Sequence, residues 1–210
     1  MTKLFKKENL VILFPAVILM LSAGCGKPEM VRETRYPNGQ RRKQYTLIVN
    51  QDGDTVKQGK DLMWYENGNL YTESYFENGV QQGKHTVWFE NGNKWFECRY
   101  KDNKRDGEYR EWHKDGSKLA EYAYSKGLRQ GPYIEWYPNG HKAYECTFVD
   151  NEKEGPATKW YNTGAKEKTG AYKRGRKHGL FIIWNKDGSV ISKRRFVDGN
   201  EVPLDSTVVE

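Results

Sequence analysis

The sequence predicts an all-β fold, an elongated antiparallel meander of tandem 24-residue β-hairpin repeats in a single curled sheet. Three observations carry this prediction. Tryptophan recurs every 24 residues, glycine-containing turn signals follow it at a fixed distance, and the segments between turns are short and rich in β-forming residues. Because every connection is short, successive strands are expected to be antiparallel neighbours.

The tryptophan ladder defines six full repeats. Each ladder tryptophan is followed by a glycine four residues later and an aromatic residue twelve residues later, and a second glycine precedes it by five. We expect the tryptophans to pack as a structural core, with a glycan-binding aromatic row as the alternative interpretation. The predicted structural ladder consists of Trp64, Trp88, Trp112, Trp136, Trp160, Trp184, Gly68, Gly92, Gly116, Gly140, Gly164 and Gly188.

Within one repeat, residues 84–89 and 94–101 predict an outgoing and a returning strand. The Asn91-Gly92 signal between them favours a tight two-residue hairpin turn, because both residues adopt positive φ at little cost. Residues 102–106 predict a looser turn into the next repeat. The outgoing strand has no clean period-2 alternation, so its inward face stays undecided at this point.

The returning strand alternates, which indicates one buried face and one wet face. Glutamate recurs at one position of the wet face. This row either binds a cation or a basic partner or is a solvated face that keeps the sheet soluble. Trp95 is the only tryptophan off the ladder. The candidate binding surface comprises Trp95, Glu73, Glu97, Glu121 and Glu145.

The chain begins with a targeting signal. Three lysines among the first seven residues precede an apolar run over 10–21, which is shorter than the ~20 residues that a spanning helix needs. The following Leu-Ser-Ala-Gly-Cys resembles the lipobox of bacterial lipoproteins. That resemblance implies cleavage before Cys25 and diacylglycerol on its sulfur. An ordinary secretory peptide and an uncleaved anchor are the alternatives.

These features divide the chain into a lipoprotein signal peptide (1–24), a tether (25–34), a repeat array with an atypical first unit (35–200) and a tail (201–210). We expect a membrane-anchored lipoprotein of the bacterial cell envelope that faces the periplasm or the cell surface. Removing the signal peptide lowers the formal net charge from +7 to about +5. A basic excess can indicate nucleic acid or anionic lipid as a partner. The expected export argues against nucleic acid and favours anionic envelope polymers or lipids.

The sequence offers no sign of catalysis. The four histidines, His85, His113, His141 and His178, occupy four different repeat positions and are expected to be exposed, so they predict no metal site. We therefore expect no enzyme, no catalytic residue and no cofactor. Cys98 and Cys146 lie two repeats apart, about 19 Å across four strands, whereas a disulfide needs Cα atoms within ~7 Å. Two free, buried thiols are predicted.

The repeats resemble the MORN-repeat variant of the YwqK antitoxin family. The match rests on aromatic-x-Asn-Gly turns, the aromatic residue twelve after tryptophan and the closing glycine, as in Trp136 to Gly140, Phe148 and Gly155. The resemblance implies a curled sheet of hairpins with a binding role, hence a protein-binding scaffold. An antitoxin or immunity-like protein that neutralises a toxin partner is one alternative, and an envelope glycan or lipid binder is another. The export signal departs from the cytoplasmic antitoxin case.

Overall fold

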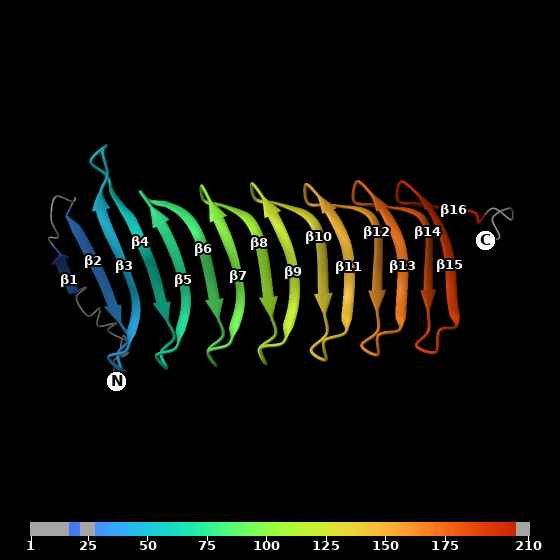
Figure 1. Ribbon diagram of the computed structural model, residues 1–210, viewed down its shortest axis with the longest axis horizontal. Helices are drawn as coiled ribbons and strands as arrows, with labels where there is room; N and C mark the ends of the chain where they lie inside the picture. The colour runs from blue at the N-terminus through green and yellow to red at the C-terminus, as the bar shows by residue number, and fades with distance from the viewer. Residues whose placement is uncertain (1–16, 22–27, 205–210) are drawn as a thin grey trace, which may run out of the picture.

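The computed structural model describes residues 17–21 and 28–204. Each strand of its single sheet is hydrogen-bonded to the strand before it and the strand after it, and all pairs are antiparallel. The predicted all-β meander is confirmed. Figure 1 shows the strands side by side across the long axis of an open, elongated sheet. The strands of the described residues are β1 (Val17–Leu21), β2 (Glu29–Arg35), β3 (Arg41–Val49), β4 (Thr55–Trp64), β5 (Leu70–Glu77), β6 (Val80–Trp88), β7 (Lys94–Lys101), β8 (Lys104–Trp112), β9 (Lys118–Ser125), β10 (Leu128–Trp136), β11 (Lys142–Val149), β12 (Glu152–Trp160), β13 (Lys166–Lys173), β14 (Arg176–Trp184), β15 (Val190–Val197) and β16 (Asn200–Val202).

The sheet extends beyond the expected array at both ends. Residues 29–34, expected to belong to a tether, form most of β2, because the following Tyr36–Gly39 loop closes a hairpin with β3. β1 lies inside the expected signal peptide and pairs with β2. Most of that peptide and Cys25 lie outside the described residues. At the other end, β16 pairs with β15, so the first residues of the expected tail belong to the sheet. No helix in the described part of the chain is long and apolar enough to cross a membrane.

The two kinds of turn are the reverse of the expectation. The glycine-containing segment after each ladder tryptophan is a five-residue loop, as in 65–69, where Gly68 N–H donates to the Tyr65 carbonyl and only the glycine has positive φ. The tight two-residue turns are those expected to be loose. Asp102 and Asn103 both have positive φ (51° and 62°), as both residues of a type I′ turn must.

Two register shifts in every repeat decide which way the side chains point. In β10, one shift lies between Gln130 and Ile134 against β9, and another lies between Glu135 and Trp136 against β11. Such bulges insert extra residues and break the period-2 alternation. They explain why the inward face of the outgoing strand could not be read from the sequence.

The sheet therefore has two distinct faces. The aromatic face carries rings from the repeats in the middle of the array. Its cross-strand pairs include Tyr109 with Tyr122 and Tyr133 with Cys146. The tryptophan face carries the ladder tryptophans and the glutamate row; Ile134, two residues before Trp136, pairs there with Glu145. Among the described residues, no second layer of structure covers either face.

The buried core belongs mostly to the aromatic face, which corrects the expectation for the tryptophans. All six ladder tryptophans are only half-buried, since their face has no covering layer. The rings and thiols of the aromatic face bury one another instead. The buried apolar residues are Ile48, Val87, Cys98, Tyr109, Ala120, Cys146, Phe148, Ala157, Phe181 and Phe196.

The loops add a second set of contacts between repeats. The hydroxyl of Tyr65 donates to the carbonyl of Trp88 at 2.8 Å, and Tyr137 repeats the bond to Trp160 at 2.7 Å. At the other edge, the amide of Gly127 donates to the carbonyl of Arg105 at 2.8 Å. Since a lone hairpin is marginally stable, these contacts and the ring packing make stability a property of neighbouring repeats.

Candidate binding surface

The aromatic face carries a continuous row of rings across β7 to β11. Phe96 stacks on Tyr109 with centroids 5.4 Å apart, and Tyr109 stacks on Tyr122 at 4.5 Å. Tyr122 continues to Tyr133 at 5.0 Å and Tyr133 to Tyr144 at 6.2 Å. Burial raises the pKa of Tyr109, Tyr122, Tyr133 and Tyr144, so these phenols are neutral hydrogen-bonding groups at physiological pH.

A row of cations runs beside the rings. A lysine or arginine lies seven residues before the ladder tryptophan in five of the six repeats and sits over the aromatic residue that follows the tryptophan by twelve. Sequence reasoning missed this row, although the period that revealed the tryptophans would have shown it. The pairs are Lys57 with Phe76 (4.7 Å), Arg105 with Tyr124 (5.3 Å), Arg129 with Phe148 (4.5 Å), Lys153 with Tyr172 (5.2 Å) and Lys177 with Phe196 (4.7 Å).

Arg105 shows how firmly these cations are held. Its guanidinium donates to the hydroxyl of Tyr124 at 3.1 Å and lies over the rings of both Tyr109 and Tyr124. An arginine that contacts two aromatic rings and a phenol hydroxyl has restricted motion, and its remaining donors suit the recognition of acidic or planar groups.

The glutamate row is engaged in ion pairs on the tryptophan face. Lys94 contacts Glu97 at 2.7 Å and lies over the ring of Trp112, and the same arrangement recurs one and two repeats later. Burial acts to raise the pKa of Glu97, but hydrogen bonds from Lys94 and Lys84 outweigh it and hold that pKa below its ordinary value. The charges of the glutamate row are thus already paired with lysines of the chain itself.

Trp95 does not share a surface with the glutamate row. It stacks on Phe89 with centroids 5.5 Å apart, packs edge-on against Phe96 and donates from Nε1 to Glu111 at 3.3 Å, so it belongs to the rim of the aromatic face. The β-bulge beside Trp88 turns the side chain of Trp95 to the face opposite that of Glu97. The structure therefore separates the candidate residues onto opposite faces.

The histidines and the two thiols lie at separate places in the sheet. Cys98 and Cys146 are free and buried, as predicted. His85, His113 and His178 are half-buried rather than exposed, and His141 is exposed as expected. His85 Nδ1 lies 2.8 Å from Ser74 Oγ and 3.2 Å from the Glu73 carbonyl oxygen. Across the described residues, no three histidine, cysteine or acidic side chains gather where they could hold a metal ion.

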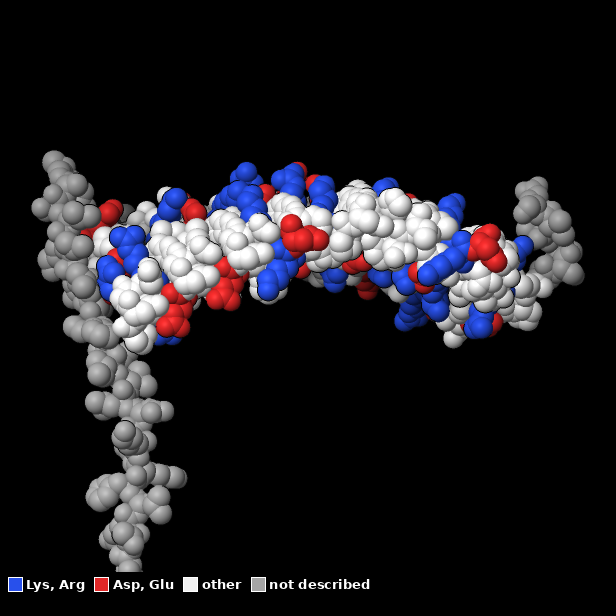
Figure 2. Space-filling view, turned by 90° about the horizontal axis from the view of Figure 1, so that it is seen from below, with Lys and Arg blue, Asp and Glu red and all other residues white. Residues whose placement is uncertain are grey.

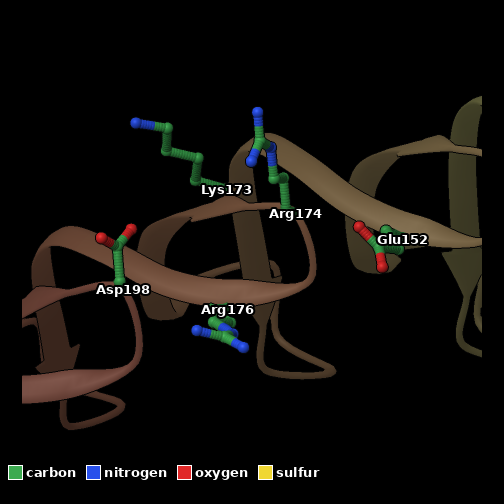
Figure 3. Close-up of a pocket in the computed structure, with 5 residues that line it drawn as sticks. All are labelled: Glu152, Lys173, Arg174, Arg176 and Asp198. Carbon is green, nitrogen blue, oxygen red and sulfur yellow. The ribbon is translucent and has the colours of Figure 1, made fainter.

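The edge of tight turns holds a cavity of about 460 Å³ with charged walls. Figure 3 shows that its side chains, from Glu152 to Asp198, point in different directions and meet at no common point. Figure 2 looks at the opposite edge and shows basic side chains along both sides of the slab. The aromatic face combines apolar area with an ordered row of cations.

Comparison with known proteins supports the repeat type. Residues 57–79, 81–102 and 129–150 match the model of the MORN repeat variant family. Each match covers one hairpin, namely β4–β5, β6–β7 and β10–β11. No curated protein matches the chain. The repeats are therefore similar to MORN repeat variants.

Proposed function

We propose that this array of MORN-type repeats is a non-enzymatic protein-binding scaffold, anchored by lipid at Cys25 in the bacterial cell envelope. The uncovered aromatic face is the observation that carries the proposal. Sheet faces rich in apolar side chains normally pack against a second layer. Here rings and cations alternate in order along a single-layer sheet. The half-buried members, such as Tyr122, Tyr133 and Arg129, keep accessible surface for a partner.

The composition of this face favours a protein. Tyrosine and arginine are enriched among the residues that dominate protein–protein binding energy, because they offer a large rigid area and several donors at little entropic cost. Arg129 lies over Phe148 and beside the Tyr133 ring, near the centre of the array. A partner that lies along the face would meet a cation beside an aromatic ring in five of the six repeats.

Crosslinked capture from the native envelope, followed by mass spectrometry, tests the proposal. The wild-type chain should recover one stoichiometric protein partner. Arg129→Glu should reduce recovery at least tenfold, because it reverses a charge in the middle of the aromatic face. Lys101→Glu, at an exposed strand end on the tryptophan face, is the matched control and should leave recovery unchanged. Equal recovery by both variants would contradict the use of the aromatic face.

The lipid anchor is tested separately. A radiolabelled or alkyne-tagged fatty acid should label the wild-type chain, and Cys25→Ser should abolish the label and release the chain from the membrane fraction. A labelled Cys25→Ser chain would contradict the anchor.

The identity of the captured protein separates a general scaffold from an antitoxin or immunity-like role. A toxin as the sole partner, whose activity the purified chain suppresses, would support the second. The YwqK-type resemblance is what motivates this alternative.

Trp95 supports an envelope glycan or lipid binder as a further candidate. It is 38% exposed and stacked almost parallel to Phe89, with an interplanar angle of 20°. Exposed parallel rings at a rim are suitable platforms for sugar rings. Recovery of polysaccharide or lipid without protein, lost in Trp95→Ala, would favour this candidate.

A further inference from the structure

The aromatic face is interrupted between β12 and β13. There Ala157 pairs directly with Gly170. Two repeats earlier, the same register positions hold Tyr109 and Tyr122. One repeat earlier, they hold Tyr133 and Cys146. A cavity of about 110 Å³, which we call the notch, lies at this interruption; its walls include Tyr144, Tyr172 and Phe181.

The floor of the notch is fixed by Phe181. An added Cβ at Gly170 would lie 2.3 Å from the ring of Phe181, so the ring occupies the space next to that glycine. Phe181 is 4% exposed and packs edge-on against Tyr172 and Phe196. The notch is therefore a built feature with an apolar floor rather than a gap left by mobile side chains.

Positive charge surrounds the notch. Lys159 and Lys168 pair directly across β12 and β13, an arrangement in which like charges destabilise a sheet. Lys168 lies 5.5 Å from the centre of the Phe181 ring, and Lys153 lies 4.7 Å from that of Tyr144. Glu167 contacts Lys159 at 2.7 Å, which leaves Lys153 and Lys168 without an acidic partner in the described residues.

Like charges crowd the notch. Burial, together with the ammonium groups of Lys177 and Lys159, lowers the pKa of Lys168, as expected where like charges crowd an apolar surface. An anion in the notch would relieve this repulsion.

The size of the notch limits the ligand to a single functional group on a short stem. A water molecule in the liquid occupies about 30 Å³, so 110 Å³ holds fewer than four. Pockets for whole metabolites are usually about 300–1,000 Å³. Rings suit the methylenes of the stem, and the lysines suit a carboxylate at its end.

We propose that the notch receives a glutamate side chain of the protein partner. This inference rests on the proposed scaffold function. The glutamate methylenes lie against the rings that line the notch, and the carboxylate lies among Lys153, Lys159 and Lys168. The notch thereby fixes the position of the partner along an otherwise repetitive face.

The probe is glutamate capped as its N-acetyl, N-methylamide form, titrated into the purified, ¹⁵N-labelled full chain. Amide shifts at Ala157 and Gly170 should saturate, whereas the capped glutamine analogue and inorganic phosphate should bind at least tenfold more weakly. Lys168→Met should weaken binding of capped glutamate at least tenfold. Lys114→Met, at an exposed loop position, should leave it unchanged. Equal binding of the glutamate and glutamine forms would overturn the proposal.

Ala157→Tyr gives an independent variant that keeps every charge. Tyrosine stands at this position in the two preceding repeats, and an aromatic residue opposite a strand glycine is a favourable pair. It should fill the notch and abolish binding of the probe while the circular dichroism spectrum is preserved. Undiminished binding by this variant would also overturn the proposal.

The failure of this inference is distinguishable from the failure of the scaffold. If capture recovers a protein partner equally with wild type, Lys168→Met and Ala157→Tyr, the scaffold stands and the notch is not its glutamate site. If the variants lose both capped glutamate and the partner, the partner supplies the glutamate. Binding of capped glutamate without any effect on capture would assign the notch to a free carboxylic acid and overturn the partner as its source.

Discussion

The ring of Tyr109 stacks on that of Tyr122 with centroids 4.5 Å apart and planes inclined by 26°. The two residues are directly paired across β8 and β9. Tyr109 is 6% exposed although no second layer covers it in the described structure, because its neighbours on the same face surround it. Contacts between neighbouring side chains along the sheet therefore bury the apolar residues that a second layer covers in other β proteins.

Tyr109→Ala should lower the free energy of unfolding by about 3–5 kcal/mol, since it removes a buried ring and opens a cavity. Urea denaturation followed by circular dichroism measures the loss. Tyr75→Ala is the control, because Tyr75 is 43% exposed and its removal should cost less than about 1 kcal/mol. Similar losses in the two variants would contradict the assignment of the core to the aromatic face.

Trp136→Ala should cost about 1–3 kcal/mol, less than a core ring, because the indole is half-buried under Lys118, whose Nζ lies 4.6 Å from the ring. Phe148→Ala, from the buried set, should cost about 3–5 kcal/mol in the same denaturation series. A larger loss for Trp136→Ala than for Phe148→Ala would restore the tryptophan ladder as the core.

The stability of the chain should depend on His85 at mildly acidic pH. Burial is the largest cause that lowers the pKa of His85; the Glu73 carbonyl acts against it, and Arg105 adds to it. The unfolded chain then binds more protons than the folded chain just below pH 6.5. The His85 contribution is present above that pH and is lost as the pH falls through the folded-state pKa.

Urea midpoints measured at pH 8 and pH 5 check this expectation. The midpoint difference should shrink in His85→Gln, whereas His141→Gln, at the exposed loop edge, should keep the wild-type difference. An unchanged difference in His85→Gln would contradict the assignment.

The two thiols should be almost inert in the folded chain. Burial raises the pKa of Cys98 to about 11, and it also raises the pKa of Cys146. At pH 8 only about one Cys98 in a thousand is a thiolate. Iodoacetamide should therefore modify both residues at least a hundredfold more slowly in the native chain than in urea, as measured by peptide mass mapping. Rapid native alkylation would show that the aromatic face opens locally.

Local signals in the sequence were sufficient to predict the repeat and the series of hairpins that it forms. The 24-residue period placed the strands, and β7 has the bounds expected from it. The spacing of Cys98 and Cys146 also predicted two free thiols, since sheet geometry alone separates them. The type of each turn was assigned wrongly, because Asn-Gly suits a two-residue turn and also the end of a longer loop, and flanking pairing selects between them.

The sequence by itself determined the period, the order of the strands and their antiparallel pairing, all of which follow from short-range spacing. Only the tertiary structure decided which face each side chain joins. Two register shifts per repeat reset the alternation, and their positions depend on hydrogen bonds to neighbouring strands. For that reason Trp95 and Glu97 lie on opposite faces of the sheet. The notch beside Ala157 and Gly170 can be recognised only when the strands are paired in their register.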